Sequence, residues 1–195
     1  MKRLGILALL VGLALAPGPV PGTAADDPGQ AIDPEAAELI AEMADLLDQA
    51  LYLAIAALSW PDEEDPALYV QGVINLIEGP SSPHYDATGG ATTPAGDGLK
   101  DLYLDFLTMR MSRIEEWSTT VPPSLAAQAG QALDHTERYL FLAAEAAKEA
   151  LTRVYSVTGG QEELRAIYAY LLAARGRTDD ELVLGGISAL AEVFP

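Results

Sequence analysis

The chain has 195 residues and no cysteine, which excludes disulfides, thiolate catalysis, covalent haem attachment through cysteine and cysteine zinc sites. Its formal net charge is −18, so it lacks the excess of cations that neutralises nucleic-acid phosphates or anionic lipid headgroups. This balance excludes nucleic acid as a partner and favours cations or basic partners. Alternatively, the charge only keeps an exported protein soluble.

Residues 1–25 have the composition of a secretory signal peptide. Lys2 and Arg3 precede an apolar run over 4–16 that is too short to span a bilayer, and small residues follow near its end. We expect cleavage after Ala25, export to the periplasm or beyond the cell, and no stable membrane insertion of the mature chain. An uncleaved anchor is the alternative.

The mature chain, of about 170 residues, suits one domain with a hydrophobic core. We interpret 26–33 as a short flexible lead and 34–195 as a single domain. Apolar residues recur at steps of three and four, and no stretch alternates as a strand does. The expected helices cover 34–60, 66–78, 98–117, 125–157, 162–175 and a last segment that begins at a capping box over 178–181. The predicted fold is all-α, an up-and-down bundle of about five to six helices.

The longest expected helix, 125–157, would extend about 50 Å at ~1.5 Å per residue. Its apolar positions lie on one face, as lengthwise packing in a bundle requires. They are Leu125, Ala129, Ala132, Thr136, Leu140, Ala143, Ala147, Ala150, Val154 and Val157. Every other amphipathic segment needs a partner of this kind, so this helix is the predicted centre of the fold.

The segment 79–98 is the predicted contact region. It holds five glycines and three prolines and has no helical period. Connections this long inside a compact domain are usually functional or disordered. We therefore expect it to bind a protein or a small ligand, and a plain mobile loop is the alternative.

Acidic residues and a histidine in and beside this loop are the candidate ligand or metal residues. They are Glu78, His84, Asp86, Asp97 and Asp101. Carboxylates and loop carbonyls suit Ca²⁺, the one cofactor considered, although no EF-hand pattern is present. Asp97 also has a simple alternative role as the N-cap of the next helix.

Gln71 and Asn75 share one helix face with Glu78, at spacings of four and three residues. These polar side chains either line a binding site or form the solvent-facing side of their helix. We keep Gln71 and Asn75 as polar-face candidates.

Catalysis has little support in the sequence. A solvated helix face explains the polar run over 134–138, because no nucleophile lies three or four residues from His135. An enzyme with His84 as its base is the least favoured hypothesis. The sequence predicts an exported, acidic helical-bundle protein that acts by binding, and a divalent-cation-binding protein is the alternative.

Overall fold

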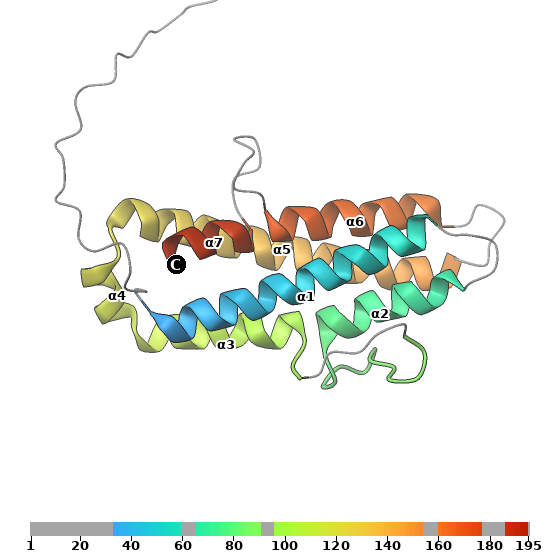
Figure 1. Ribbon diagram of the computed structural model, residues 1–195, viewed down its shortest axis with the longest axis horizontal. Coiled ribbons are helices and arrows are strands. Elements are labelled where there is room, and N and C mark those ends of the chain that lie inside the picture. Colours follow the sequence, from blue (N-terminus) through green and yellow to red (C-terminus); the bar gives the residue numbers. More distant parts are fainter. Residues whose placement is uncertain (1–32, 60–64, 91–95, 154–159, 177–185, 195) are drawn as a thin grey trace, which may run out of the picture. The chain divides into compact units, whose positions relative to one another are not determined.

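The computed structural model describes residues 33–59, 65–90, 96–153, 160–176 and 186–194. These ranges contain seven helices and no strand, which confirms the all-α prediction. The helices, labelled in Figure 1, are α1 (Pro34–Leu58), α2 (Pro66–Glu78), α3 (Leu99–Ser112), α4 (Ile114–Thr120), α5 (Pro123–Arg153), α6 (Gln161–Arg175) and α7 (Ile187–Val193). The expected signal peptide, residues 26–32 of the lead and the capping box over 178–181 lie outside the described residues.

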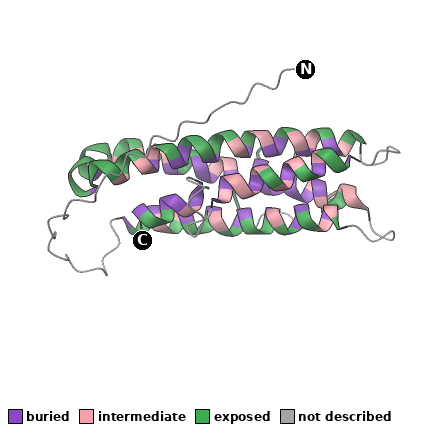
Figure 2. Cartoon of the chain, turned by 90° about the horizontal axis from the view of Figure 1, so that it is seen from above, coloured by how far each residue is buried: buried purple, intermediate pink, exposed green. Residues whose placement is uncertain are grey.

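Two long helices organise the packing. α1 packs against α2, α3, α6 and α7, and α5 packs against α2, α6 and α7. α2 and α3 follow one another along α1, and α6 and α7 are arranged in the same way (Figure 1). Buried side chains line the inner sides of the helices, and exposed ones the outer sides (Figure 2). The backbones of α3 and α5 do not pack closely against each other.

The predicted apolar face of the longest helix is confirmed where the structure describes it. All seven positions from Ala129 to Ala150 are buried, and Leu125 is half-buried. Val154 and Val157 lie outside the described ranges. Alanine dominates this face, and small side chains let neighbouring helices approach closely.

Pairs of glycines hold the ends of successive helices together. Gly79, with φ of +73°, ends α2, and a Cβ added there would lie 2.6 Å from the backbone nitrogen of Gly98. Gly186, with φ of +79°, precedes α7, and an added Cβ would lie 2.6 Å from the nitrogen of Gly176. Positive φ and missing side chains permit both contacts. The segments 79–98 and 176–186 therefore start and end at almost the same point.

The expectation of one helix over 98–117 is wrong. Arg113, with φ of −111° and ψ of 15°, separates α3 from α4. Its guanidinium donates to both carboxylate oxygens of Asp33, at 2.7 and 2.6 Å, and also pairs with Glu35. The indole of Trp117 donates to Asp33 as well, at 3.0 Å. This break raises the number of helices in the described ranges to seven.

Asp33 corrects the expectation that the lead is flexible throughout. Its side chain is buried and accepts hydrogen bonds from the amides of Glu35 and Ala36, so it is the N-cap of α1. Burial alone raises the pKa of Asp33, but hydrogen bonds from Arg113, Ala36 and Trp117 outweigh it and lower the pKa. Residue 33 therefore belongs to the folded core.

None of the helices in the described ranges is both long and apolar enough to span a bilayer.

Candidate binding site

The polar face of α2 holds the first half of the predicted contact loop. Asn75 is fully buried, and its side-chain amide pairs with the backbone of Asp86: Nδ2 donates to the carbonyl oxygen at 2.8 Å, and Oδ1 accepts from the amide at 3.0 Å. Gln71 donates to Asn75 Oδ1 and to the carbonyl of His84. The interpretation of this face as a solvent-facing side is therefore wrong.

Glu78 connects the loop to two helices. Its carboxylate accepts hydrogen bonds from Ser82 Oγ at 2.6 Å, Lys100 Nζ of α3 at 2.7 Å and Lys148 Nζ of α5 at 2.9 Å. Burial alone raises the pKa of Glu78, but the hydrogen bonds from Lys100, Ser82 and Lys148 outweigh it and lower the pKa to about 2. Glu78 is therefore a buried carboxylate that stays ionised.

The other predicted acidic ligands do not converge with Glu78 on one point. Asp86 Oδ1 caps its own turn, accepting hydrogen bonds from Thr88 and from the amide of Gly89. Asp101 accepts a hydrogen bond from Ser81. Asp97 is exposed and is not the N-cap of α3, because that position is Gly98.

Within the described ranges, no three His, Asp or Glu residues are placed to hold a metal ion. The Ca²⁺ alternative therefore gains no support from this part of the chain. His84 is exposed, and its hydrogen bonds to described residues come from its backbone.

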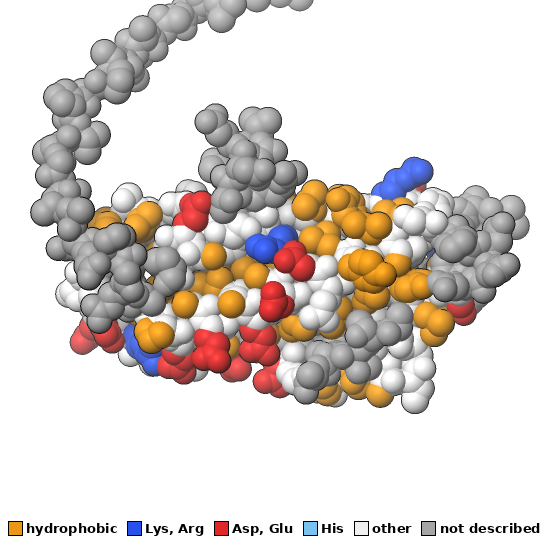
Figure 3. Space-filling model, viewed as in Figure 1, with side chains coloured by type: hydrophobic (Ala, Val, Ile, Leu, Met, Phe, Trp, Pro, Cys, Tyr) orange, Lys and Arg blue, Asp and Glu red, His pale blue; other side chains and the backbone are white. Residues whose placement is uncertain are grey.

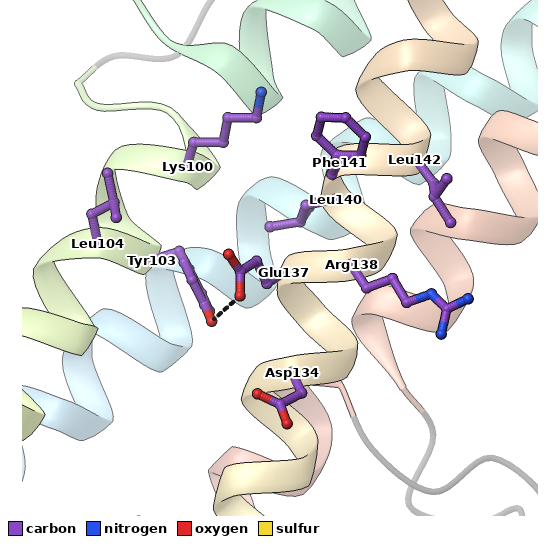
Figure 4. Close-up of a pocket in the computed structure, with 9 residues that line it drawn as sticks. All are labelled: Lys100, Tyr103, Leu104, Asp134, Glu137, Arg138, Leu140, Phe141 and Leu142. Atoms are coloured by element: carbon purple, nitrogen blue, oxygen red, sulfur yellow. Dashed lines mark hydrogen bonds between the residues drawn. The ribbon is translucent and has the colours of Figure 1, made fainter.

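A groove lies between α3 and α5, where these helices do not pack closely; we call it the α3–α5 groove. It encloses about 740 Å³. Figure 4 shows the residues that line it: Lys100, Tyr103, Leu104, Asp134, Glu137, Arg138, Leu140, Phe141 and Leu142. Leu104 and Phe141 are each 57% exposed. Large apolar side chains therefore remain open to solvent along this seam.

Tyr103 forms the inner wall of the α3–α5 groove. Its hydroxyl donates to the carbonyl oxygen of Leu133 at 3.3 Å and lies 3.5 Å from a carboxylate oxygen of Glu137 (Figure 4). Burial, the negative charges of Glu137 and Asp134 and the contact with Glu137 raise the pKa of Tyr103 to about 12. Arg110 acts in the opposite direction. The phenol stays neutral at physiological pH, in negative surroundings.

A second cavity, of about 130 Å³, lies farther along the same seam. Leu133, whose carbonyl accepts the Tyr103 hydrogen bond, lines it together with an aromatic cluster. The ring centroids of Trp117 and Phe194 are 4.6 Å apart, and Phe106 lies 5.9 Å from each of them. The apolar seam therefore continues past Tyr103.

The α3–α5 groove was not predicted from the sequence, although the sequence contains one signal for it. The run Tyr139-Leu140-Phe141-Leu142 is apolar all round the helix, and an amphipathic surface helix has only one apolar side. Leu140 is buried and Leu142 half-buried, which leaves Phe141 on the outer side. Phe141 shares the groove with the exposed Leu104 of α3, and contiguous exposed apolar surface marks a contact site, whereas a single exposed side chain does not.

Comparison with protein-family models, curated proteins and solved structures gives no match to this chain.

Proposed function

We propose that this chain is a non-catalytic binding protein that holds a small amphiphilic molecule in the α3–α5 groove. The observation that carries the proposal is an apolar groove of about 740 Å³ with Leu104 and Phe141 exposed on its two walls. Pockets for small ligands typically enclose about 300–1,000 Å³ and combine apolar walls with a few polar groups. The polar groups of this groove are those of Lys100, Tyr103, Asp134, Glu137 and Arg138.

The helix arrangement supports this proposal. We interpret the fold as an up-and-down bundle of four columns, in which α1 and α5 are two columns and the pairs α2–α3 and α6–α7 are the others. α2 packs against α5 but α3 does not pack closely against it. One seam of the bundle is thus closed in one half and open in the other, and a ligand would fill the open half.

Binding has more support than catalysis. A general base needs a hydrogen-bonded partner or nucleophile within about 3 Å. Among the described residues, the imidazole of His84 has no such partner, and His135 contacts only the ring edge of Tyr139, with centroids 6.0 Å apart. Neither histidine lines the groove.

The proposal is tested with the neutral dye Nile red, whose fluorescence rises in apolar surroundings. We expect saturable binding, and we expect Phe141→Ser and Leu104→Ser to weaken it at least about fivefold through lost apolar contact. The matched controls are Tyr52→Ser and Leu68→Ser, which change exposed apolar residues outside the groove. Equal losses in the controls, or no saturable binding, would contradict the proposal.

The first half of the loop, residues 79–90, is a second candidate contact region. Asn75 and Gln71 hold its backbone, while the side chains of His84 and Thr88 remain exposed. A rigid backbone that presents exposed side chains suits recognition of a partner. If this loop is the contact region, His84→Ala with Thr88→Ala abolishes partner capture by the mature chain and leaves its melting temperature unchanged.

Cation binding is tested by thermal melts. A ligand that binds only the folded chain raises its stability by RT ln(1 + [L]/Kd). A raised melting temperature at millimolar Ca²⁺ would support the cation alternative, and no shift would exclude it.

We also propose that the chain is exported after cleavage near Ala25, on the strength of the basic and apolar pattern of residues 1–25. Intact-mass measurement of the protein recovered outside the cytoplasm tests this. An intact N-terminus in the cytoplasmic fraction alone would contradict it.

A further inference from the structure

We infer that the α3–α5 groove takes a cationic amphiphile, a molecule with one amine or quaternary ammonium group on an apolar body. This inference rests on the proposed function and specifies its ligand. It follows from the charges and aromatic rings that surround the groove.

The free charges that face α3 across the groove are negative. Asp134 and Glu137 of α5 both lie on the side of that helix toward Tyr103 (Figure 4). Within the described ranges, neither carboxylate forms an ion pair, and Glu137 has only its long contact with the Tyr103 hydroxyl. A cation in the groove would meet two carboxylates that no side chain of the described ranges neutralises through an ion pair.

The positive groups near the groove are already committed or turned away. Lys100 donates to the buried carboxylate of Glu78 at 2.7 Å. Arg138 also lines the groove, but its guanidinium extends away from Tyr103 (Figure 4). Arg110 lines the smaller cavity beyond Tyr103 rather than the groove itself. The field inside the groove is therefore negative, in agreement with the raised pKa of Tyr103.

Two aromatic rings provide the second element of cation recognition. The exposed ring of Phe141 on α5 and the largely buried ring of Tyr103 on α3 both line the groove. Aromatic faces attract ammonium groups, and aromatic cages are the usual recognition sites of quaternary ammonium ions. Leu104, Leu140 and Leu142 offer apolar surface to the rest of the molecule. The groove thus combines carboxylates and rings with an apolar surface for the ligand body.

The size of the groove and the charge of the whole chain narrow the ligand further. A stable protein partner needs a contact area of about 800 Å² on each side. The groove volume of about 740 Å³ instead lies in the range of pockets that hold one small molecule. The net charge of −18 repels anionic amphiphiles and raises the local concentration of cations. The row of acidic side chains over α1 and α3 in Figure 3 adds to this field.

The test compares three head groups on one tail. Dodecyltrimethylammonium, dodecyl sulfate and dodecyl maltoside, all below their micelle concentrations, are titrated calorimetrically into the mature chain. We expect the ammonium probe to bind at least about tenfold more tightly than the sulfate, which corresponds to ~1.4 kcal/mol. We expect the neutral probe to lie between them, and added salt to reduce the difference.

Variants localise the effect. Glu137→Gln and Asp134→Asn should each weaken ammonium binding about two- to fivefold, as expected for partly exposed charge pairs, and leave the neutral probe unaffected. Phe141→Ala should weaken ammonium binding more than neutral binding. Glu42→Gln, which changes an exposed carboxylate of α1 outside the groove, is the control and should change neither.

The outcomes separate this inference from the proposed function. Equal binding of all three probes, or tighter binding of the sulfate, would overturn the inference that the ligand is a cation. The proposed function, ligand binding in the groove, would stand. Binding of none of the probes would overturn both. Loss of ammonium preference in Glu42→Gln as large as in Glu137→Gln would show a general charge effect and overturn recognition by the groove.

Discussion

Glu78 shows how one side chain connects the loop with the helices that border the groove. Its carboxylate receives Ser82 from the loop, Lys100 from α3 and Lys148 from α5. The sequence placed Glu78 correctly on one face with Gln71 and Asn75, but spacing within a helix does not say what covers that face. The two lysines come from segments far along the chain, so the sequence alone could not predict this cluster.

The pH dependence of stability follows from Glu78. Folding lowers its pKa from 4.5 to about 2, so its stabilising contribution is complete above about pH 4.5 and is lost as the pH falls toward 2. Glu78→Gln should lower the free energy of unfolding at pH 7 by about 2–3 kcal/mol, because each unit by which folding lowers a pKa corresponds to ~1.4 kcal/mol of stability. Urea unfolding of both proteins between pH 7 and pH 2 measures this.

The difference between the two proteins should shrink below pH 4.5, because protonation removes the charge that Gln lacks. Glu38→Gln, which changes an exposed carboxylate of α1, is the control. A difference for Glu78→Gln that stays constant down to pH 2 would contradict an ionised, stabilising Glu78.

Asn75 gives a second prediction at this scale. Asn75→Ala removes the two hydrogen bonds between this buried side chain and the backbone of Asp86, and each hydrogen bond contributes about 0.5–1.5 kcal/mol. We expect the free energy of unfolding to fall by about 1–3 kcal/mol and the amide of Asp86 to lose protection from hydrogen exchange. Gln49→Ala, at an exposed position of α1, is the control, and an equal effect there would contradict this assignment.

At the scale of the helices, close contacts between glycines, Gly79 with Gly98 and Gly176 with Gly186, determine how successive helices join. Gly79→Ala places a Cβ 2.6 Å from the nitrogen of Gly98, at a φ of +73°. We expect a loss of more than about 1 kcal/mol of stability. Gly130, inside α5, has open space around it, so Gly130→Ala should instead stabilise by about 0.5–1 kcal/mol. Thermal melts of both variants that shift in the same direction would contradict the close contact.

Asp33 connects the start of α1 with α4. Asp33→Ala removes the N-cap together with the partners of Arg113 and Trp117, and we expect a loss of about 2–3 kcal/mol. Asp33→Asn keeps a capping oxygen and should lose less than Asp33→Ala. Equal losses in urea unfolding would show that the capping oxygen adds nothing beyond the ion pair and would contradict the N-cap role of Asp33.

Local patterns predicted the helices well, and contacts between distant residues account for the errors. The period of three to four residues reveals the buried face of α5 from Ala129 to Ala150 because neighbouring turns alone determine it. The break at Arg113 depends on Asp33, 80 residues away. No pattern within 98–117 records that contact, so the sequence continued the helix through it.

The contacts that Asn75 and Glu78 make with the loop over 79–98 change what we expect from its deletion. The sequence predicted a contact region over 79–98, with a plain mobile loop as the alternative. Deleting Ser81 to Ala95 would leave Asn75 and Glu78 without part of their hydrogen bonds. We now expect this deletion to lower the melting temperature as well as to remove any contact that the loop makes.

At the scale of the whole molecule, the open seam between α3 and α5 is the feature that suggests a function. The helices were predictable, but which pairs pack and which leave a groove depends on how they are placed in space. Tyr103 and Phe141 belong to different helices, and the apolar run over 139–142 is the one sign of the groove in either of them. Their juxtaposition, with Asp134 and Glu137 beside them, appears only in the assembled fold.

Amide chemical shifts of the isotope-labelled mature chain, titrated with dodecyltrimethylammonium, test the groove most directly. We expect saturable shifts concentrated at Tyr103, Leu104, Glu137 and Phe141, with little change at Tyr52 on α1. Shifts that stay concentrated at Tyr52, or in the 79–90 loop, or that never saturate would contradict ligand binding between α3 and α5.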